Sequence, residues 1–114
     1  MDELSSVFAA LANEHRRQIV LALALRPHSI SELAELRGLS LPAIHKHIAV
    51  LEDSEMVRRR KVGRTTILAL QRAPLRRLQA WVGRFHPDWG TDDEGLDNYA
   101  DHFLHQVTPT KEPK

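Results

Sequence analysis

The 114-residue chain is predicted to fold as a mainly α-helical domain with one small β-hairpin. Apolar residues recur at helical spacing in several segments, as at Leu4, Val7 and Leu11. One segment, residues 57–70, instead has the features of two strands joined by a turn at Gly63-Arg64. The length is typical of a single domain, and a content of 42% apolar residues suffices for a hydrophobic core.

The composition excludes several classes of protein. The chain contains no cysteine, which rules out disulfides, thiolate nucleophiles and cysteine-ligated zinc. Its longest strongly apolar run, Ile19–Leu25, is far shorter than the roughly 20 residues that span a bilayer. Asp2 and Glu3 stand where a secretory signal would be basic. We therefore expect a cytoplasmic protein that does not enter a membrane.

Charge is unevenly distributed along the chain. The formal net charge is only +1, but residues 37–77 contain ten basic and three acidic side chains, whereas residues 87–114 contain two basic and seven acidic ones. A basic block of this kind is either a solvated face or a surface that binds phosphate. The motifs within the block decide between these two interpretations.

Two helices are predicted before the basic block. The first spans residues 3–12 with Asp2 as its cap, and the second begins after Asn13 and ends before Pro27. Their apolar stripes consist of Leu4, Val7, Phe8 and Leu11 in the first, and of Ile19, Val20, Leu23 and Ala24 in the second.

A helix-turn-helix is predicted over about residues 31–53. Ser29 and Glu32 have the spacing of a capping box for its first helix, with Ser31 as an alternative cap. Gly38 ends this helix, and Ser40 caps the second helix, which spans about residues 41–53. The inner stripe of the second helix consists of Ile44, Ile48 and Leu51.

A basic β-hairpin follows over about residues 57–70. Valines flank a run of arginine and lysine in residues 57–62, and residues 65–70 form the returning strand. A helix-turn-helix followed by such a hairpin is a winged helix, in which the hairpin, or wing, lies beside DNA while the second helix enters the major groove. Further helices are predicted over about 74–85 and 93–105. We expect the folded domain to span residues 1–106 and residues 107–114 to form a flexible tail.

This ordered set of motifs resembles the ArsR-type winged-helix repressors over roughly residues 5–90. At the start of the domain the resemblance rests on Phe8–Ile19, which contains Ala10-Leu11-Ala12-Asn13 and Arg16-Arg17. In the helix-turn-helix it rests on Ser31–Glu35 and Leu39–Glu52, and at the turn into the wing on Met56–Arg60 followed by Gly63-Arg64. It implies a homodimeric, cytoplasmic DNA-binding repressor whose first and last helices form the dimer interface. The metal-free subgroup, with a tryptophan in its penultimate helix, is the most similar.

Two positions depart from the family pattern. His45 stands where the family usually has a small hydroxyl residue in the recognition helix, which predicts an altered base preference. Glu55 stands where a glycine often ends that helix, which predicts a different helix exit and a changed wing angle.

Candidate DNA contacts come from the exposed side of the second helix and from the wing. Lys46 can donate to guanine or phosphate, and Leu41 can contact a thymine methyl group. Because side chains alternate along a strand, Arg58 and Arg60 point one way and Arg59 and Lys61 the other, so that one pair faces DNA. The inner-side His47 is expected to have a structural role. The predicted DNA-binding residues are Ser40, Leu41, Pro42, His45, Lys46, Arg59, Lys61, Arg64 and Thr65.

Apolar residues near both ends exceed what one thin helical domain needs for its own core. We therefore predict that they form the contact between two copies of the chain related by a twofold axis. The predicted interface residues are Leu4, Val7, Phe8, Leu11, Trp81, Leu96, Tyr99, Phe103 and Leu104.

Three other functions compete with DNA-binding regulation. Asp97, Asp101, His102 and His105 could form a zinc site across a dimer, which would make a metal-responsive repressor. The basic face could instead bind an acidic protein partner. An enzyme is not supported, because the chain has no phosphate-binding loop, no HExxH motif and no nucleophile with a base at motif spacing. We predict no resident metal or cofactor, and the sequence identifies no inducer.

Overall fold

The computed structural model describes residues 2–86 and 90–107, and its contacts divide the chain into two compact units. One unit ends at Val82 and the other begins at Gly83. The predicted flexible tail lies outside the described residues except for Val107, which is the last residue of a helix. Within the described residues, no helix combines the length and the apolar character that crossing a bilayer requires.

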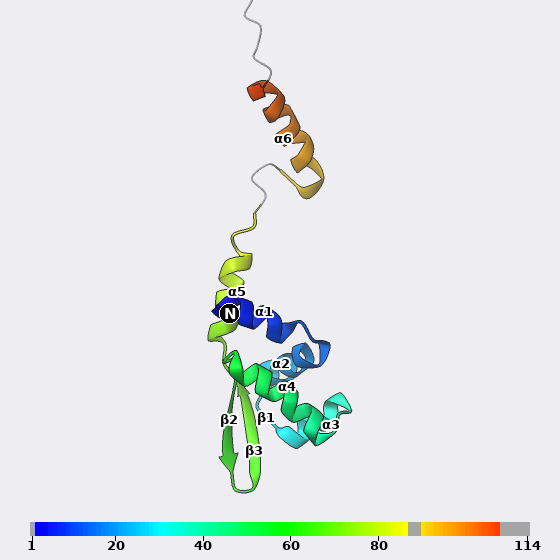
Figure 1. The fold of residues 1–114 in the computed structure, drawn as a ribbon, viewed down its shortest axis with the longest axis vertical. Helices are drawn as coiled ribbons and strands as arrows, with labels where there is room; N and C mark the ends of the chain where they lie inside the picture. Colours follow the sequence, from blue (N-terminus) through cyan, green and yellow to red (C-terminus); the bar gives the residue numbers. More distant parts are fainter. Residues whose placement is uncertain (1, 87–89, 108–114) are drawn as a thin grey trace, which may run out of the picture. The chain divides into compact units, whose positions relative to one another are not determined.

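The first unit is a helical domain with a small sheet, as the sequence predicts (Figure 1). In the second unit the described secondary structure is one helix. In chain order the elements are α1 (Glu3–Leu11), α2 (Glu14–Leu25), β1 (His28–Ser29), α3 (Ile30–Arg37), α4 (Leu41–Asp53), β2 (Val57–Val62), β3 (Thr65–Leu70) and α5 (Ala73–Val82) in the first unit, and α6 (Asp92–Val107) in the second.

The structure differs from the prediction mainly in two places. The helix expected over 74–85 ends at Val82, where the next residue is Gly83, whose backbone freedom disfavours helix continuation. The segment His28–Ser29, for which the sequence predicts no strand, pairs with β3 and forms a third strand. The strand order is therefore β1-β3-β2, with antiparallel pairing throughout.

The predicted wing is confirmed with the expected bounds. In the hairpin Val57 lies opposite Leu70 and Val62 lies opposite Thr65, which leaves a two-residue loop at Gly63-Arg64. Gly63 has a φ of 64°, a backbone conformation that glycine adopts without steric cost at the first position of such a loop. Figure 1 shows the hairpin extending away from the helices of its unit.

The predicted helix caps are also confirmed. The backbone N–H of Ser5 donates to Asp2 Oδ1 at 2.7 Å, and that of Arg16 donates to Asn13 Oδ1 at 3.2 Å. At α3 the cap is Ser29 and not Ser31. The Glu32 N–H donates to Ser29 Oγ at 3.1 Å, while the Ser29 N–H donates to Glu32 Oε1 at 2.9 Å, which completes the capping box.

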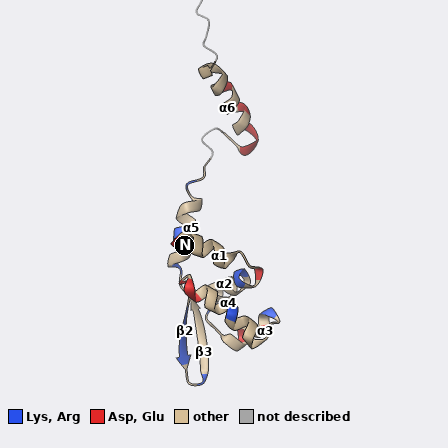
Figure 2. Ribbon diagram, in the orientation of Figure 1, with Lys and Arg blue, Asp and Glu red and all other residues tan. Residues whose placement is uncertain are grey.

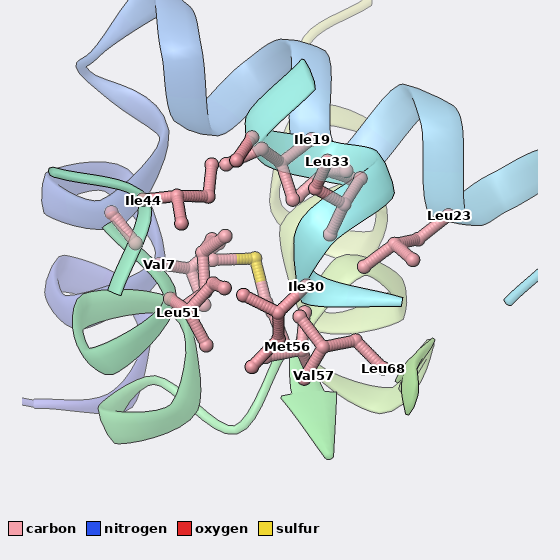
Figure 3. Packing of buried hydrophobic residues seen from close by; sticks show 14 residues of the cluster. Val7, Ile19, Leu23, Ile30, Leu33, Ile44, Leu51, Met56, Val57 and Leu68 are labelled. Carbon is pink, nitrogen blue, oxygen red and sulfur yellow. The ribbon is translucent and has the colours of Figure 1, made fainter. Parts of the chain in front are cut away.

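The core of the first unit joins the helices to the base of the wing (Figure 3). Leu68 and Met56 are fully buried together with the inner stripe of α4, so the wing is attached to the helix-turn-helix through the core itself. The main buried side chains are Val7, Ile19, Leu23, Ile30, Leu33, Ile44, Ile48, Leu51, Met56, Val57 and Leu68.

The exit of α4 corrects one prediction. The sequence predicts that Glu55 changes the helix exit because it replaces a glycine, yet Glu55 takes the left-handed conformation that glycine would take, with a φ of 62°. The N–H of Met56 donates to the carbonyl of Leu51 at 3.0 Å, and that of Glu55 donates to the carbonyl of Glu52 at 2.9 Å. These bonds close the helix end as a glycine would. The cost is the steric strain of a Cβ in this conformation.

Replacing Glu55 with glycine should therefore stabilise the protein. We expect Glu55→Gly to raise the free energy of unfolding by about 0.5–1 kcal/mol, since relief of left-handed strain outweighs the added flexibility of the unfolded chain. Chemical denaturation measures this change. Glu55→Ala, which keeps the Cβ, serves as the control and should not give the same gain. A glycine variant no more stable than the alanine variant contradicts the strain argument.

His47 has the structural role that the sequence predicts, although its partner lies on α2. Its Nδ1 lies 3.2 Å from Nη1 of Arg16, whose Nε donates to the carbonyl of Ala10 at 2.6 Å. Partial burial lowers the pKa of His47 below its ordinary value of 6.5, and the positive charge of Arg16 lowers it further. The folded state thus favours neutral His47, whose Nδ1 accepts the hydrogen bond from Arg16.

The stability of the fold should consequently decrease as the pH falls through about 6.5. Below the unfolded-state pKa the unfolded chain gains a proton at His47 that the folded chain resists, so acid favours unfolding. Denaturation at pH 7.5 and 5.5 measures this difference. In His47→Gln, part of the decrease should disappear, whereas His45→Gln, at an exposed position of the same helix, should behave as the wild type. An unchanged pH dependence in His47→Gln would argue against this assignment.

Candidate nucleic-acid interface

The turn between α3 and α4 determines where the second helix begins. Gly38 has a φ of 63° and its N–H donates to the carbonyl of Glu35 at 3.1 Å, while the N–H of Leu39 donates to the carbonyl of Ala34 at 2.9 Å. The chain then reaches Ser40, whose Oγ accepts a hydrogen bond from the N–H of Ala43 at 3.3 Å. The predicted roles of Gly38 and Ser40 are therefore confirmed, and α4 starts at a defined position.

Burial of one side of α4 determines which side chains are exposed. Ile44, Ile48 and Leu51 have no exposed surface. Because residues at three- and four-residue spacing share a face, the opposite face is left to solvent. The exposed residues at the start of α4 are the predicted ones, namely Ser40, Leu41, Pro42, His45 and Lys46.

A groove brings the start of α4 and the wing tip together. It has a volume of about 210 Å³ and is bounded by the first residues of α3, by α4 and by the hairpin. Four of the predicted DNA-binding residues line it, namely Leu41, His45, Arg64 and Thr65. Sequence analysis missed Ser31 and Thr66, which add hydroxyl groups to the same groove. The strand pairing could have identified Thr66, because Thr66 lies opposite Lys61, which is itself a predicted DNA-binding residue.

The two faces of the wing differ in their surroundings. Val57 and Leu68 are buried, so the face that also bears Arg59 and Lys61 is the one turned toward the helices. Arg59 makes a bidentate ion pair with Glu52 of α4, with Nε–Oε2 and Nη2–Oε1 distances of 2.7 and 2.8 Å. This hydrogen-bonded pair raises the pKa of Arg59. The charge of Arg59 is thus already neutralised within the chain.

The other face of the wing bears Arg58 and Arg60. These arginines lie opposite Ala69 and Ile67, and together with Pro27 they line an open hollow of about 780 Å³ that extends over β2. Figure 2 shows that β2 is basic along most of its length, whereas the first turn of α6 is acidic. The basic block seen in the sequence is therefore concentrated on the wing.

The predicted dimer residues differ in how far they are exposed. Val7 has no exposed surface and packs in the core of its own chain, so it offers nothing to a second copy. Phe8 of α1 is 42% exposed and meets Trp81 of α5 edge to face, with ring centroids 5.2 Å apart. Leu4 and Leu11 are half-buried in the same unit. On α6, the predicted residues Leu96, Tyr99, Phe103 and Leu104 are all exposed.

The alternative metal site on α6 has only part of the geometry that it needs. His105 Nδ1 lies 2.7 Å from the backbone carbonyl of Asp101, which leaves the other ring nitrogen of His105 as its possible ligand atom. Among residues 2–86 and 90–107, no three histidine, aspartate or glutamate side chains converge in the way that a metal ion requires.

Comparisons with known proteins match this arrangement. A helix-turn-helix domain family model matches residues 11–60. Two regulators of Mycobacterium tuberculosis are similar, namely the HTH-type transcriptional regulators KmtR (38% identity over 63% of this chain and 55% of the relative) and Rv2034 (36% identity over 67% of this chain and 71% of the relative). The chain thus spans little more than half of the length of KmtR.

Solved structures give the same result. A crystal structure of an ArsR family transcriptional regulator superposes with a TM-score of 0.68 at 36% identity, covering 72% of this chain and 84% of the other. A homodimeric winged helix-turn-helix DNA-binding domain from Mycobacterium bovis has a TM-score of 0.62 at 23% identity, covering 96% of this chain and 89% of the other, and shows likeness of fold. With its helix-turn-helix, its wing and these relatives, the chain belongs to the ArsR family of winged helix-turn-helix transcriptional regulators.

Proposed function

We propose that this protein binds duplex DNA sequence-specifically and regulates transcription as a repressor that occupies a promoter. The observation that carries the proposal is the groove in which the exposed start of α4 meets the basic wing tip. A helix with one exposed polar side and a cationic hairpin beside it match the two contacts that winged helices make with a duplex. Such a regulator acts in the cytoplasm.

The residues of the interface divide into base contacts and backbone contacts. Lys46 is exposed near the middle of the face opposite the buried stripe, where it can donate to the O6 and N7 of guanine. His45 and Leu41 lie on the groove side, within reach of neighbouring base edges. Arg64 and Thr65 at the wing tip contact the sugar-phosphate backbone.

Arg59 takes a different role from the one that the sequence predicts. Because both carboxylate oxygens of Glu52 already accept from Nε and Nη2 of its guanidinium, Arg59 has little charge left to offer a phosphate. We propose that it holds the wing against α4. Lys61, on the same strand face and without an ion pair among the described residues, then supplies the phosphate contact that Arg59 does not.

We also propose that the protein acts as a homodimer. The α6 helix has no buried residue, although Leu96, Phe103 and Leu104 form an apolar stripe along one side. A single helix of this length is marginal in water unless such a stripe is covered. A homodimer is also the state of the related M. bovis domain. A twofold dimer would present two α4 helices about 34 Å apart to an inverted-repeat operator.

Substitutions of Lys46 and Arg64 should separate base contacts from phosphate contacts. Lys46→Ala should reduce binding to the operator by about tenfold or more, while non-specific binding changes less. Arg64→Ala should weaken binding to all duplexes and make the slope of log affinity against log salt shallower by about 0.9 per subunit. Fluorescence anisotropy on the upstream intergenic DNA and on a scrambled duplex measures both effects. Arg72→Ala, at an exposed residue that does not line the groove, is the control, and wild-type binding by both test variants contradicts the docking.

The dimer contact can be tested on α6 with two substitutions to the same residue. Phe103→Asn removes a large apolar side chain from the stripe and should raise the dimer dissociation constant by about tenfold or more. Asp101→Asn, on the polar side of the same helix, should leave it unchanged. Sedimentation equilibrium measures both constants. Equal association of the two variants would show that the α6 stripe does not form the dimer interface.

A further inference from the structure

Arg37, which sequence analysis left without a role, is held in place by a neutral partner. It is the last residue of α3, and its Nε donates to Nδ1 of His15 on α2 at 3.1 Å. A ring nitrogen that accepts a hydrogen bond carries no proton, so His15 orients the guanidinium without neutralising its charge. The half-buried position of both side chains limits their motion.

The charge of Arg37 is therefore available to a ligand, unlike that of several other arginines. Arg59 pairs with Glu52, Arg26 with Glu32 at 3.2 Å, and Arg77 with Glu3 at 3.3 Å. Across residues 2–86 and 90–107, Arg37 has no such carboxylate partner. A positioned but uncompensated guanidinium is suited to bind an anion, and its planar fork matches phosphate.

A second histidine–arginine pair lies directly beside the first. Nη1 of Arg16 lies 3.2 Å from Nδ1 of His47, and the rings of His47 and His15 have centroids 5.5 Å apart. Arg16 is fixed further by the carbonyls of Ala9 and Ala10. We call Arg37, His15, Arg16 and His47 the α2 cluster. It joins α2, α3 and α4 and contains two guanidinium charges.

The α2 cluster lies on the side of α4 that faces away from the wing. Glu52, which pairs with Arg59, marks the wing side of α4. His47 precedes it by five positions, which corresponds to about 140° around a helix with 3.6 residues per turn. Arg37 is also three residues before Ser40, the cap of α4. A helix in the major groove has a phosphate backbone on either side, and the wing accounts for one side only.

We propose that Arg37, positioned by His15, binds a phosphate of the second DNA strand on the side of α4 opposite the wing. This inference rests on the proposed DNA-binding function and adds a contact to it. With this contact the protein binds phosphates on both sides of the major groove, Arg64 on one DNA strand and Arg37 on the other. The flank formed by α2 thereby helps to set the depth and the angle of α4 in the groove.

The salt dependence of DNA binding tests this proposal. Arg37→Gln should weaken binding to specific and scrambled duplexes alike and make the slope of log affinity against log salt shallower by about 0.9 per subunit. Arg37→Lys should keep most of the slope, because an ammonium group also neutralises a phosphate. Arg72→Gln is the matched control. Arg72 is exposed, donates to the backbone carbonyl of Ala24 at 3.5 Å and carries the same charge. Circular dichroism establishes that all variants are folded at the assay temperature.

Each outcome of this comparison is decisive. A shallower slope in Arg37→Gln alone supports the phosphate contact. The contact is contradicted if the slope of Arg37→Gln equals that of the wild type. It is also contradicted if Arg37→Gln and Arg72→Gln reduce the slope equally, because an equal reduction would reflect only the loss of net charge. If Arg64→Ala alters the slope while Arg37→Gln does not, the inference fails and the proposed function stands. If the wild-type protein retards no duplex at low salt, the proposed function itself fails.

Discussion

Burial of Ile44, Ile48 and Leu51 is the constraint on which the rest of the interface depends. These side chains fix the rotation of α4 about its own axis, so that His45 and Lys46 are exposed. Large-to-small substitutions of fully buried aliphatic side chains typically cost about 2–5 kcal/mol, so the core holds this rotation firmly. The same core contains Met56 and Leu68, which fixes the base of the wing relative to α4. The α4 helix and the base of the wing are thus held together by one hydrophobic core.

The basic residues of the first unit have two different roles: some stabilise the fold, and others are available to bind DNA. Arg59 and Arg16 are bound within the fold, the first by Glu52 and the second by the end of α1 and by His47. Arg64 and Lys46 are exposed and without an ion pair in the described part of the chain, and Arg37 is oriented by a neutral histidine. A count of positive charges does not distinguish these groups. The partners of each side chain do, because a phosphate contact requires both a charge that no carboxylate compensates and N–H donors that are not already engaged within the fold.

Local chemistry made most of the fold predictable from sequence. The caps Asp2, Asn13 and Ser40, the turn at Gly38 and the hairpin loop at Gly63 depend on neighbours only a few residues away. The two-residue strand β1 was missed because it has no periodicity of its own and exists only through pairing with β3. The Arg59–Glu52 and Arg37–His15 contacts join different elements, the latter across 22 residues, so only the tertiary structure shows them.

Amide chemical-shift mapping of the isotope-labelled protein during titration with a duplex shows whether α4, the wing tip and Arg37 form one DNA-binding surface. At low salt any mixed-sequence duplex suffices, because backbone contacts do not require the operator. The largest shifts should fall on the start of α4, on the wing tip around residues 63–66 and on the residues next to Arg37. Shifts confined to α6, or no shifts at all, would contradict this prediction.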